Sequence, residues 1–111
     1  MSDGLVAMEL NGLACLQGRL HAWAMRRNLI EGSTAQAQLV KLVEEVGELA
    51  GGIAKHRSNV VRDSIGDCIV VLSILATQSG LELSDCVECA WDEIKDRRGR
   101  MVDGMFIKEG D

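Results

Sequence analysis

The apolar residues of this chain recur at three- and four-residue steps in four successive segments, a period typical of helices that bury one face. Glycines and capping residues separate the segments. The helices are expected from Leu5 to about Met25, from a capping box at Ser33 and Gln36 to near His56, from Val61 to Ala76 before Gly80, and from Ser84 to Gly99.

Each helix has an expected inward face. In the first helix this face consists of Leu13, Leu16, Leu20 and Trp23, and in the fourth of Val87, Ala90, Trp91 and Ile94. The second helix has the most regular stripe, formed by Leu39, Leu42, Val43, Val46, Leu49, Ala50 and Ile53. The third becomes apolar nearly all round beyond Asp67, which predicts that it is the central helix.

The C-terminal tail differs from the four helical segments. In it, Asp103-Gly104 separates two short runs of mainly apolar residues, 100–102 and 105–107. An Asp-Gly pair between such runs indicates a two-residue hairpin turn between strands. Within this tail, Met101, Met105 and Phe106 are expected to cover the core or a partner subunit. The 111 residues contain no proline, repeat or low-complexity linker. The sequence therefore predicts an all-α fold over a single domain, 1–111, with a short C-terminal β-hairpin.

Charge and hydropathy limit the kinds of molecule that the chain is expected to bind. Seventeen acidic against twelve basic residues give a formal charge of −5, which disfavours nucleic acid polymers and anionic membranes. The longest mainly apolar stretch, 68–76, is about half the ~20 residues that a membrane helix needs. Residues 1–4 lack the features of a signal peptide, so a cytoplasmic location with reduced thiols is expected. Cys86 and Cys89 have metal-like spacing, but no second pair completes a zinc set.

Five carboxylates suggest the chemistry: Glu44, Glu45, Glu48, Asp63 and Asp67. At ~100° per residue, Glu45 and Glu48 lie about 60° apart at the border of the apolar stripe. Asp63 and Asp67 are one turn apart on the next helix, and two antiparallel helices would bring both sets together. Clustered and partly buried carboxylates need a cation, and an oxygen-only site suits Mg²⁺, with Mn²⁺ able to substitute. The alternative is that the glutamates form a solvated charge patch.

The same residues carry a family resemblance. The segment 41–49 followed by 63–67 resembles the signature of the MazG-like all-α nucleotide pyrophosphohydrolases, and the similarity extends from about Trp23 to the end. That pattern has two glutamates, a third glutamate three residues later, and a later helix with an acidic residue three positions before an aspartate. This chain departs from it at Ser64, so that either Asp63 or a water would complete the metal shell.

The resemblance implies a four-helix bundle completed by oligomerisation, as a homodimer or homotetramer. It implies a metal held by Glu45, Glu48 and Asp67, with Glu44 as a further ligand or the base. The reaction would be Mg²⁺-dependent hydrolysis of a nucleoside triphosphate at the α-phosphorus, giving the monophosphate and pyrophosphate. The segment 92–104 resembles the ending of a phage and bacterial subgroup, whose phage members act on purine deoxynucleotides such as dGTP.

Several further residues are candidates for substrate binding, each with a structural alternative. Lys41 lies one turn before Glu45. Lys95 and Arg98 share one face near the end of the fourth helix, where they could reach phosphates, in their own or a neighbouring subunit, or serve the helix dipole and solubility alone. Trp23 with Arg27 and Asn28 could flank a base, although Trp23 also continues the first helix's apolar stripe.

Three other functions compete with this interpretation. A di-iron bundle protein would need a Glu-x-x-His step, and neither position 48 nor position 51 is histidine. A dUTP or phosphoribosyl-ATP pyrophosphohydrolase shares the chemistry, and the sequence shows no feature that selects the base. A helical dimer that has lost activity through Ser64 is the non-catalytic alternative. The interpretation carried forward is a (d)NTP pyrophosphohydrolase with a slight preference for dGTP.

Overall fold

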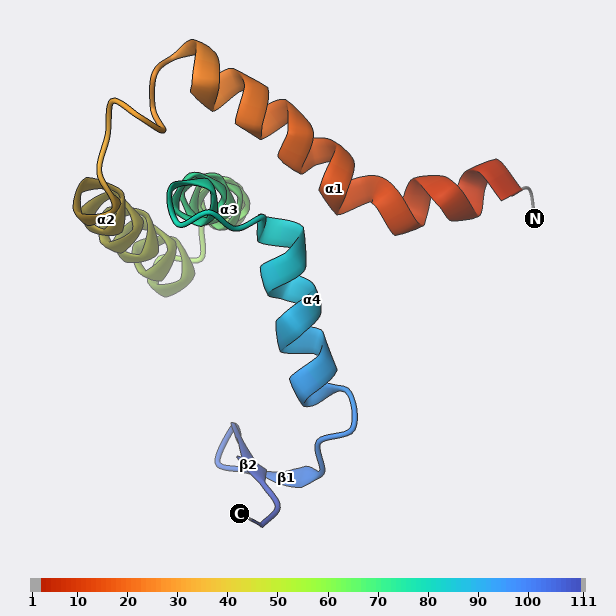
Figure 1. The fold of residues 1–111 in the computed structure, drawn as a ribbon. Helices are drawn as coiled ribbons and strands as arrows, with labels where there is room; N and C mark the ends of the chain where they lie inside the picture. The colour runs from red at the N-terminus through yellow and green to blue at the C-terminus, as the bar shows by residue number, and fades with distance from the viewer. Residues whose placement is uncertain (1–2, 111) are drawn as a thin grey trace.

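The computed structural model describes residues 3–110, with the side chains of residues 12–110. Its elements are α1 (Asp3–Arg26), α2 (Ala35–Ala54), α3 (Ser58–Gln78), α4 (Leu83–Ile94), β1 (Gly99–Val102) and β2 (Met105–Lys108) (Figure 1). The predicted fold class, four helices followed by a short hairpin, is confirmed. None of the described helices combines the length and the apolarity that a membrane span needs.

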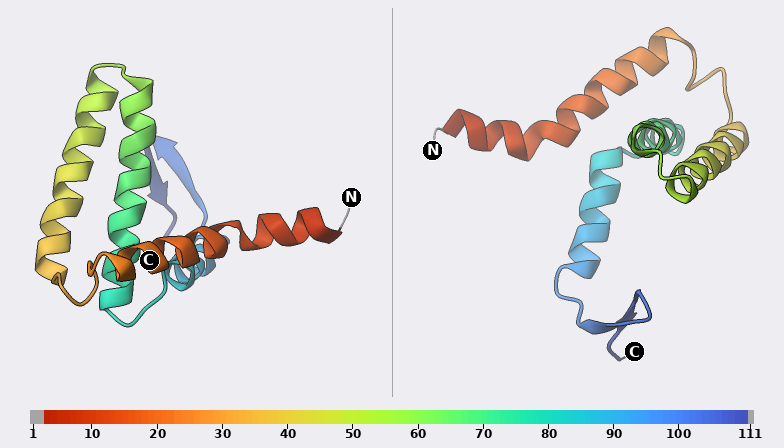
Figure 2. Two further views of the ribbon diagram at one scale, coloured as in Figure 1. Left: turned by 90° about the horizontal axis from the view of Figure 1, so that it is seen from above. Right: turned by 180° about the vertical axis from the view of Figure 1, so that it is seen from behind.

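The helices are arranged around α3. Helices α2 and α3 form a long antiparallel pair, and α1 and α4 each contact α3 and one another. Figure 2 (left) shows α1 in front of the α2–α3 layer and the β-hairpin behind it. Within the described part of the chain, the hairpin strands contact each other and no helix. Helix α4 and the hairpin therefore form an arm that extends from the rest of the molecule (Figure 1).

Helix α2 begins one residue later than the capping box predicts. Thr34 has the extended conformation of a cap (φ −126°, ψ 159°), and its Oγ1 accepts a hydrogen bond from the Ala37 N–H at 3.1 Å. The Ser33 hydroxyl instead accepts a hydrogen bond from Gln38 Nε2 at 3.0 Å. The prediction of Ser33 as the cap was therefore wrong, because that hydroxyl is used by a side chain of the following turn.

Both predicted ends of α4 also need correction. Glu82 is the residue before the helix, without a side-chain cap, and the Ser84 N–H donates to Gln17 Oε1 of α1 at 2.6 Å. The helix ends at Ile94 rather than at Gly99, which is the first residue of β1. A Cβ on Gly99 would collide with the carbonyl oxygen of Ile107 and the ring of Phe106. This glycine therefore serves strand pairing and not a helix end.

The predicted hairpin is confirmed. Strands β1 and β2 are antiparallel, with Met101 opposite Phe106 and Val102 opposite Met105. Asp103 and Gly104 both have positive φ, 49° and 79°, as a two-residue turn of type I′ requires. Gly80, with φ 75°, likewise ends the third helical segment as expected.

The α2–α3 pair is closest near its connecting loop. A Cβ on Gly52 would lie 3.0 Å from Val60 Cγ1 and 3.3 Å from Val61 Cγ2, so the absence of a side chain lets the helices approach. At the other end, Gln78 Nε2 donates to the Ile30 carbonyl at 3.1 Å and ties α3 to the loop before α2. These contacts fix the relative position of the two helices.

The core is smaller than the sequence pattern suggests. Its buried apolar side chains are Ala24, Val71, Ile74, Ala76 and Leu83. Only Leu42 and Leu49 of the predicted α2 stripe are partly covered, because the stripe is wider than the face that α3 covers. The predicted inward residues that remain exposed are Leu13, Leu16, Leu39, Val43, Val46, Ala50, Ile53, Val87, Ala90, Trp91 and Ile94. The tail residues expected to cover the core or a partner, Met101, Met105 and Phe106, are exposed as well.

The position of the α2 cap gives a test. We expect Thr34→Ala to lower the free energy of unfolding by about 1 kcal/mol, because the Ala37 N–H loses its acceptor. Gln36→Ala is the matched control, since the side chain of Gln36 is exposed and the capping box that would use it is absent. Urea unfolding followed by circular dichroism measures both. Equal losses in the two variants would contradict Thr34 as the cap.

Candidate metal centre

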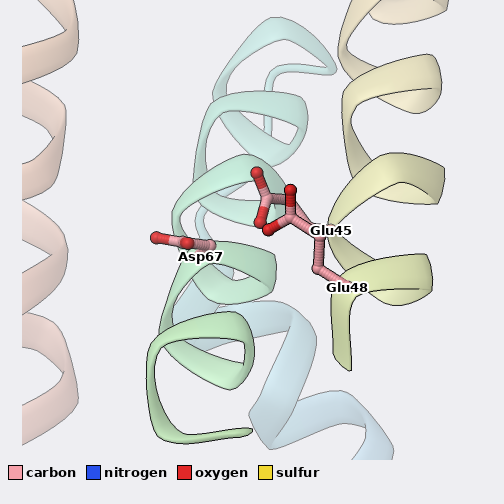
Figure 3. Close-up of side chains that lie close together, drawn as sticks. All are labelled: Glu45, Glu48 and Asp67. Atoms are coloured by element: carbon pink, nitrogen blue, oxygen red, sulfur yellow. The ribbon is translucent and has the colours of Figure 1, made fainter. Parts of the chain in front are cut away.

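Three of the predicted carboxylates meet between α2 and α3. Glu45 and Glu48 lie on the side of α2 that borders α3, and Asp67 comes from α3. One oxygen of each lies within 4.8 Å of an oxygen of the other two. Figure 3 shows both glutamates reaching from α2 across to α3, where Asp67 stands. The helical spacing of these residues therefore converges as the sequence predicts.

Glu45 is the buried member of this carboxylate cluster, with 6% of the residue exposed. Its Oε1 lies 3.3 Å from Lys41 Nζ, one turn earlier on the same helix. Its Oε2 is buried and has no hydrogen-bond partner among the described residues. A buried, ionised oxygen without a donor is costly, so this atom marks a place where a cation fits.

The electrostatics of Asp67 indicate the same deficit of positive charge. Its pKa is raised above its ordinary value, first by desolvation, then by the charge of Glu45 and a side-chain hydrogen bond to it, and further by the charge of Asp63. Lys41 opposes these effects and lowers the pKa of Asp67. The hydrogen bond between two carboxyl groups needs a shared proton, and with both groups ionised Oε2 of Glu45 has no donor. The protein groups around the cluster therefore compensate only part of its negative charge.

The arrangement fits a divalent ion that prefers oxygen. Two oxygens bound to one Mg²⁺ at about 2.1 Å are at most about 4.2 Å apart, so the 4.8 Å spread needs only a small side-chain adjustment. Glu45 is buried, whereas Glu48 and Asp67 are exposed, so the site opens to solvent on one side. An ion held there would keep coordination positions free for phosphate oxygens and water.

The other predicted acidic residues lie beside this cluster. Asp63 is outside the group of converging oxygens, although it is close enough to raise the pKa of Asp67. Glu44 is exposed, with its Oε2 3.6 Å from Lys41 Nζ. Ser64 is only 2% exposed, so a longer acidic side chain at this position would displace packed atoms. The serine that stands where the family pattern has an acidic residue is therefore tightly packed. Residue spacing alone does not reveal this packing.

The predicted substrate-binding residues are only partly brought to the cluster. Lys41 contacts Glu45 directly, and its pKa is raised first by the hydrogen bond from its ammonium group to Glu45 and then by the charges of Glu44 and Glu45. The guanidinium of Arg27 lies 4.9 Å from the centre of the Trp23 ring, so one face of this half-buried ring is already covered. Asn28 is exposed, with a left-handed backbone (φ 54°). The sequence groups Arg27 with Trp23 as flanks of a base, but does not predict that Arg27 itself lies over the ring.

Lys95 and Arg98 lie elsewhere in the single chain. Lys95 directly follows α4 and pairs with Asp92 at 3.3 Å, on the arm that extends away from α2 and α3 (Figure 1). Arg98 lines a hollow of about 610 Å³ at the junction of α4 and the hairpin, together with acidic and basic neighbours. Within one chain these two cations therefore do not meet the carboxylate cluster.

Comparisons with known proteins bear on this cluster. A family model described as the MazG nucleotide pyrophosphohydrolase domain matches residues 33–101, more than half of the chain and the part that contains all three carboxylates. The chain is also similar to an "Uncharacterized 18.2 kDa protein in rep-hol intergenic region" of Haemophilus phage HP1 (strain HP1c1), with 52% identity over 63 residues. That match covers 57% of this chain and 39% of the phage protein. No solved structure matches the chain.

The raised pKa of Asp67 predicts a gain in stability when its charge is removed. The folded state binds the proton of Asp67 more tightly than the unfolded state, so ionisation at neutral pH disfavours folding. We expect Asp67→Asn to raise the melting temperature at pH 7 in EDTA, with the gain shrinking as pH falls toward the unfolded pKa near ~3.9. Added Mn²⁺ should stabilise the native sequence more than the variant. A lower melting temperature for Asp67→Asn at pH 7 would contradict the charge excess.

Proposed function

Because the chain belongs to the MazG nucleotide pyrophosphohydrolase family, we propose that it hydrolyses a nucleoside triphosphate to the monophosphate and pyrophosphate. The reaction would use Mg²⁺, or Mn²⁺ in its place, and occur in the cytoplasm. The cysteines Cys15, Cys68, Cys86 and Cys89 are free in the structure, which is compatible with a reducing compartment. The role would be to clear unwanted nucleotides or to supply monophosphates.

The observation that carries this proposal is the unpartnered Oε2 of Glu45 within the cluster formed with Glu48 and Asp67. A solvated charge patch would not bury one of its carboxylates. A bound divalent cation would supply neutralisation of the phosphate chain and a lowered pKa of water at the site. The chain's own negative charge makes such a cation necessary for a polyanionic substrate.

The residues would then divide into ligands and orienting groups. Glu45, Glu48 and Asp67 would hold the ion, and Asp63 would complete the shell from one turn away, directly or through a water. Glu44, exposed beside the cluster, would accept the proton of the attacking water. Lys41 fixes Glu45 by its 3.3 Å contact and would add positive charge near the phosphates.

The base and the outer phosphates would be bound by residues outside the cluster. Trp23 and Asn28 would contact the base, with the free face of the Trp23 ring available for stacking. Lys95 and Arg98 would reach phosphates only in a neighbouring subunit, since their arm extends away from their own cluster. We therefore propose a homodimer or homotetramer as the working form.

Loss of one ligand gives the sharpest test of the ion site. We expect Glu48→Gln to lower kcat/KM by about three orders of magnitude, because metal assistance in phosphoryl chemistry contributes several kcal/mol. Pyrophosphate release in the presence of Mg²⁺ measures the loss, and circular dichroism should show an unchanged fold because Glu48 is exposed.

Glu88→Gln is the matched control, since Glu88 is an exposed glutamate on α4, outside the cluster. This variant should keep the native rate. Retained activity in Glu48→Gln would refute its role as a ligand. If the native protein releases no pyrophosphate from any nucleotide with Mg²⁺ or Mn²⁺, the non-catalytic helical dimer becomes the correct interpretation.

The nucleotide preference is tested separately. Among the eight common ribo- and deoxyribonucleoside triphosphates, we expect dGTP to give the highest kcat/KM, on the basis of the similarity of residues 92–104 to a phage subgroup. Monophosphate formation with and without Mg²⁺ measures the preference. Equal turnover of all eight would remove the guanine preference. If none of the eight is hydrolysed, while dUTP or phosphoribosyl-ATP assayed beside them is, the substrate would be reassigned.

A further inference from the structure

The carboxylate cluster lies between two ends of the α2–α3 pair that differ in chemistry. Figure 2 (left) shows α1 crossing one end of the pair, and the connection between α2 and α3 at the other. Trp23, in the last turn of α1, and Asn28, in the loop that follows, belong to the α1 end. The connecting end is cationic, because residues 49–62 contain three lysine or arginine residues and no aspartate or glutamate. A nucleotide has a similar polarity, with an uncharged base at one end and anionic phosphates at the other.

Lys55, directly after α2, places a positive charge on the face that carries the carboxylates. At ~100° per residue it lies within about 20° of Glu48, two turns further along the helix. It is exposed, and its ammonium group forms no ion pair with any residue that the structure describes. Lys41 and Lys95, by contrast, each pair with a carboxylate. The charge of Lys55 is therefore available to an anionic ligand.

The two residues one turn before Lys55 leave its path toward the cluster open. They are Gly51 and Gly52, and a long side chain on a helix lies back over the residues three and four positions before it. Packing explains Gly52, since a Cβ there would meet Val60 Cγ1 at 3.0 Å, whereas a Cβ on Gly51 would meet nothing within 4 Å. Glycine inside a helix is less favourable than alanine. The uncovered surface that Gly51 offers to the Lys55 side chain gives this glycine a reason.

The spacing along α2 matches the parts of a nucleoside triphosphate. At ~1.5 Å per residue, Lys55 lies about 10 Å beyond Glu48, and an extended lysine side chain directed back along the helix covers more than half of that distance. The gap that remains is the size of a diphosphate group. In the other direction, Gln38, whose Nε2 donates to Ser33 Oγ of the loop at 3.0 Å, lies about 10 Å before Glu45. That second distance is comparable to the length of a nucleoside.

We propose that the nucleotide lies along the α2–α3 pair with its base at the α1 end and its outer phosphates at the connecting end, where Lys55 binds the leaving pyrophosphate. This orientation rests on the proposed hydrolysis. As the water oxygen bonds to the α-phosphorus, the bond from that phosphorus to the bridging oxygen breaks and leaves its electron pair on the pyrophosphate. The protonated Lys55 stabilises the negative charge that develops there, while Glu44 takes the proton of the water.

Binding of pyrophosphate alone tests Lys55 without turnover. In titration calorimetry of the full chain in excess Mn²⁺, we expect Lys55→Gln to raise the dissociation constant of inorganic pyrophosphate about tenfold, because a charge-assisted contact is lost. Arg62→Gln is the matched control, since Arg62 is an exposed cation of the same end that lies about 140° from Asp67. Unchanged binding in Lys55→Gln, equal losses in both variants, or no binding by the native protein would overturn the proposal.

The other product tests the orientation. Lys55→Gln should leave the binding of deoxyguanosine monophosphate unchanged, whereas Trp23→Leu should weaken it and leave the binding of pyrophosphate unchanged. Equal weakening of both products by Lys55→Gln would show that Lys55 does not mark the pyrophosphate end. This result would overturn the orientation even if Trp23→Leu failed to fold.

A size series at Gly51 tests the path of the Lys55 side chain. Gly51→Leu should weaken pyrophosphate binding about as much as Lys55→Gln, because the leucine would cover the surface over which Lys55 extends. Gly51→Ala is the matched control, since a methyl group leaves that path open, and both substitutions favour the helix. Native affinity in Gly51→Leu would overturn the reach of Lys55 toward the cluster.

Turnover measured on the same proteins separates this inference from the proposed reaction. A native protein that binds pyrophosphate through Lys55 but releases none from any nucleotide would refute the hydrolysis and keep the binding residue. An active native enzyme whose Lys55→Gln variant binds pyrophosphate as tightly as the native chain would keep the hydrolysis and overturn the role of Lys55.

Discussion

The contact between α2 and α3 places a glutamate where water reaches little of it. One oxygen of Glu45 is matched by Lys41, and the other has no donor among the described residues. Such a carboxylate is retained in a fold only if something compensates its charge, and a divalent ion shared with Glu48 and Asp67 would do so. The close approach at Gly52 and the hydrogen bond from Gln78 to Ile30 keep the two helices in the position that creates this deficit.

The same helix pair explains why the monomer leaves so much apolar surface uncovered. A pair of helices has two faces, and here one of them carries the carboxylates together with α1. The apolar residues that belong to a bundle core are consequently on the other face, where the described chain supplies no cover apart from the beginning of α4. The carboxylate cluster on one side and the exposed apolar face on the other are two results of one arrangement.

Sequence periodicity was sufficient to predict the helices and the convergence of Glu45, Glu48 and Asp67, and the Asp103-Gly104 pair was sufficient to predict the hairpin turn. It was insufficient where tertiary partners decide, as at Ser33 and Ser84, whose polar groups bind other segments instead of capping. Periodicity also gives the width of an apolar stripe, but it does not show which part of the chain covers that stripe. For this reason Val43 and Trp91 were predicted to face inward, whereas both are exposed. The orphaned oxygen of Glu45 is visible only in three dimensions.

The raised pKa of Asp67 connects stability with ion binding. Repulsion among Asp67, Glu45 and Asp63 could be relieved by moving the helices apart, by a proton or by a cation. Movement is opposed by the packing of Val60 and Val61 against Gly52. A proton on Asp67 relieves the repulsion only as pH falls toward its raised pKa. At neutral pH a cation remains as the way to relieve the repulsion, and the free energy of that relief would add to the affinity for the ion.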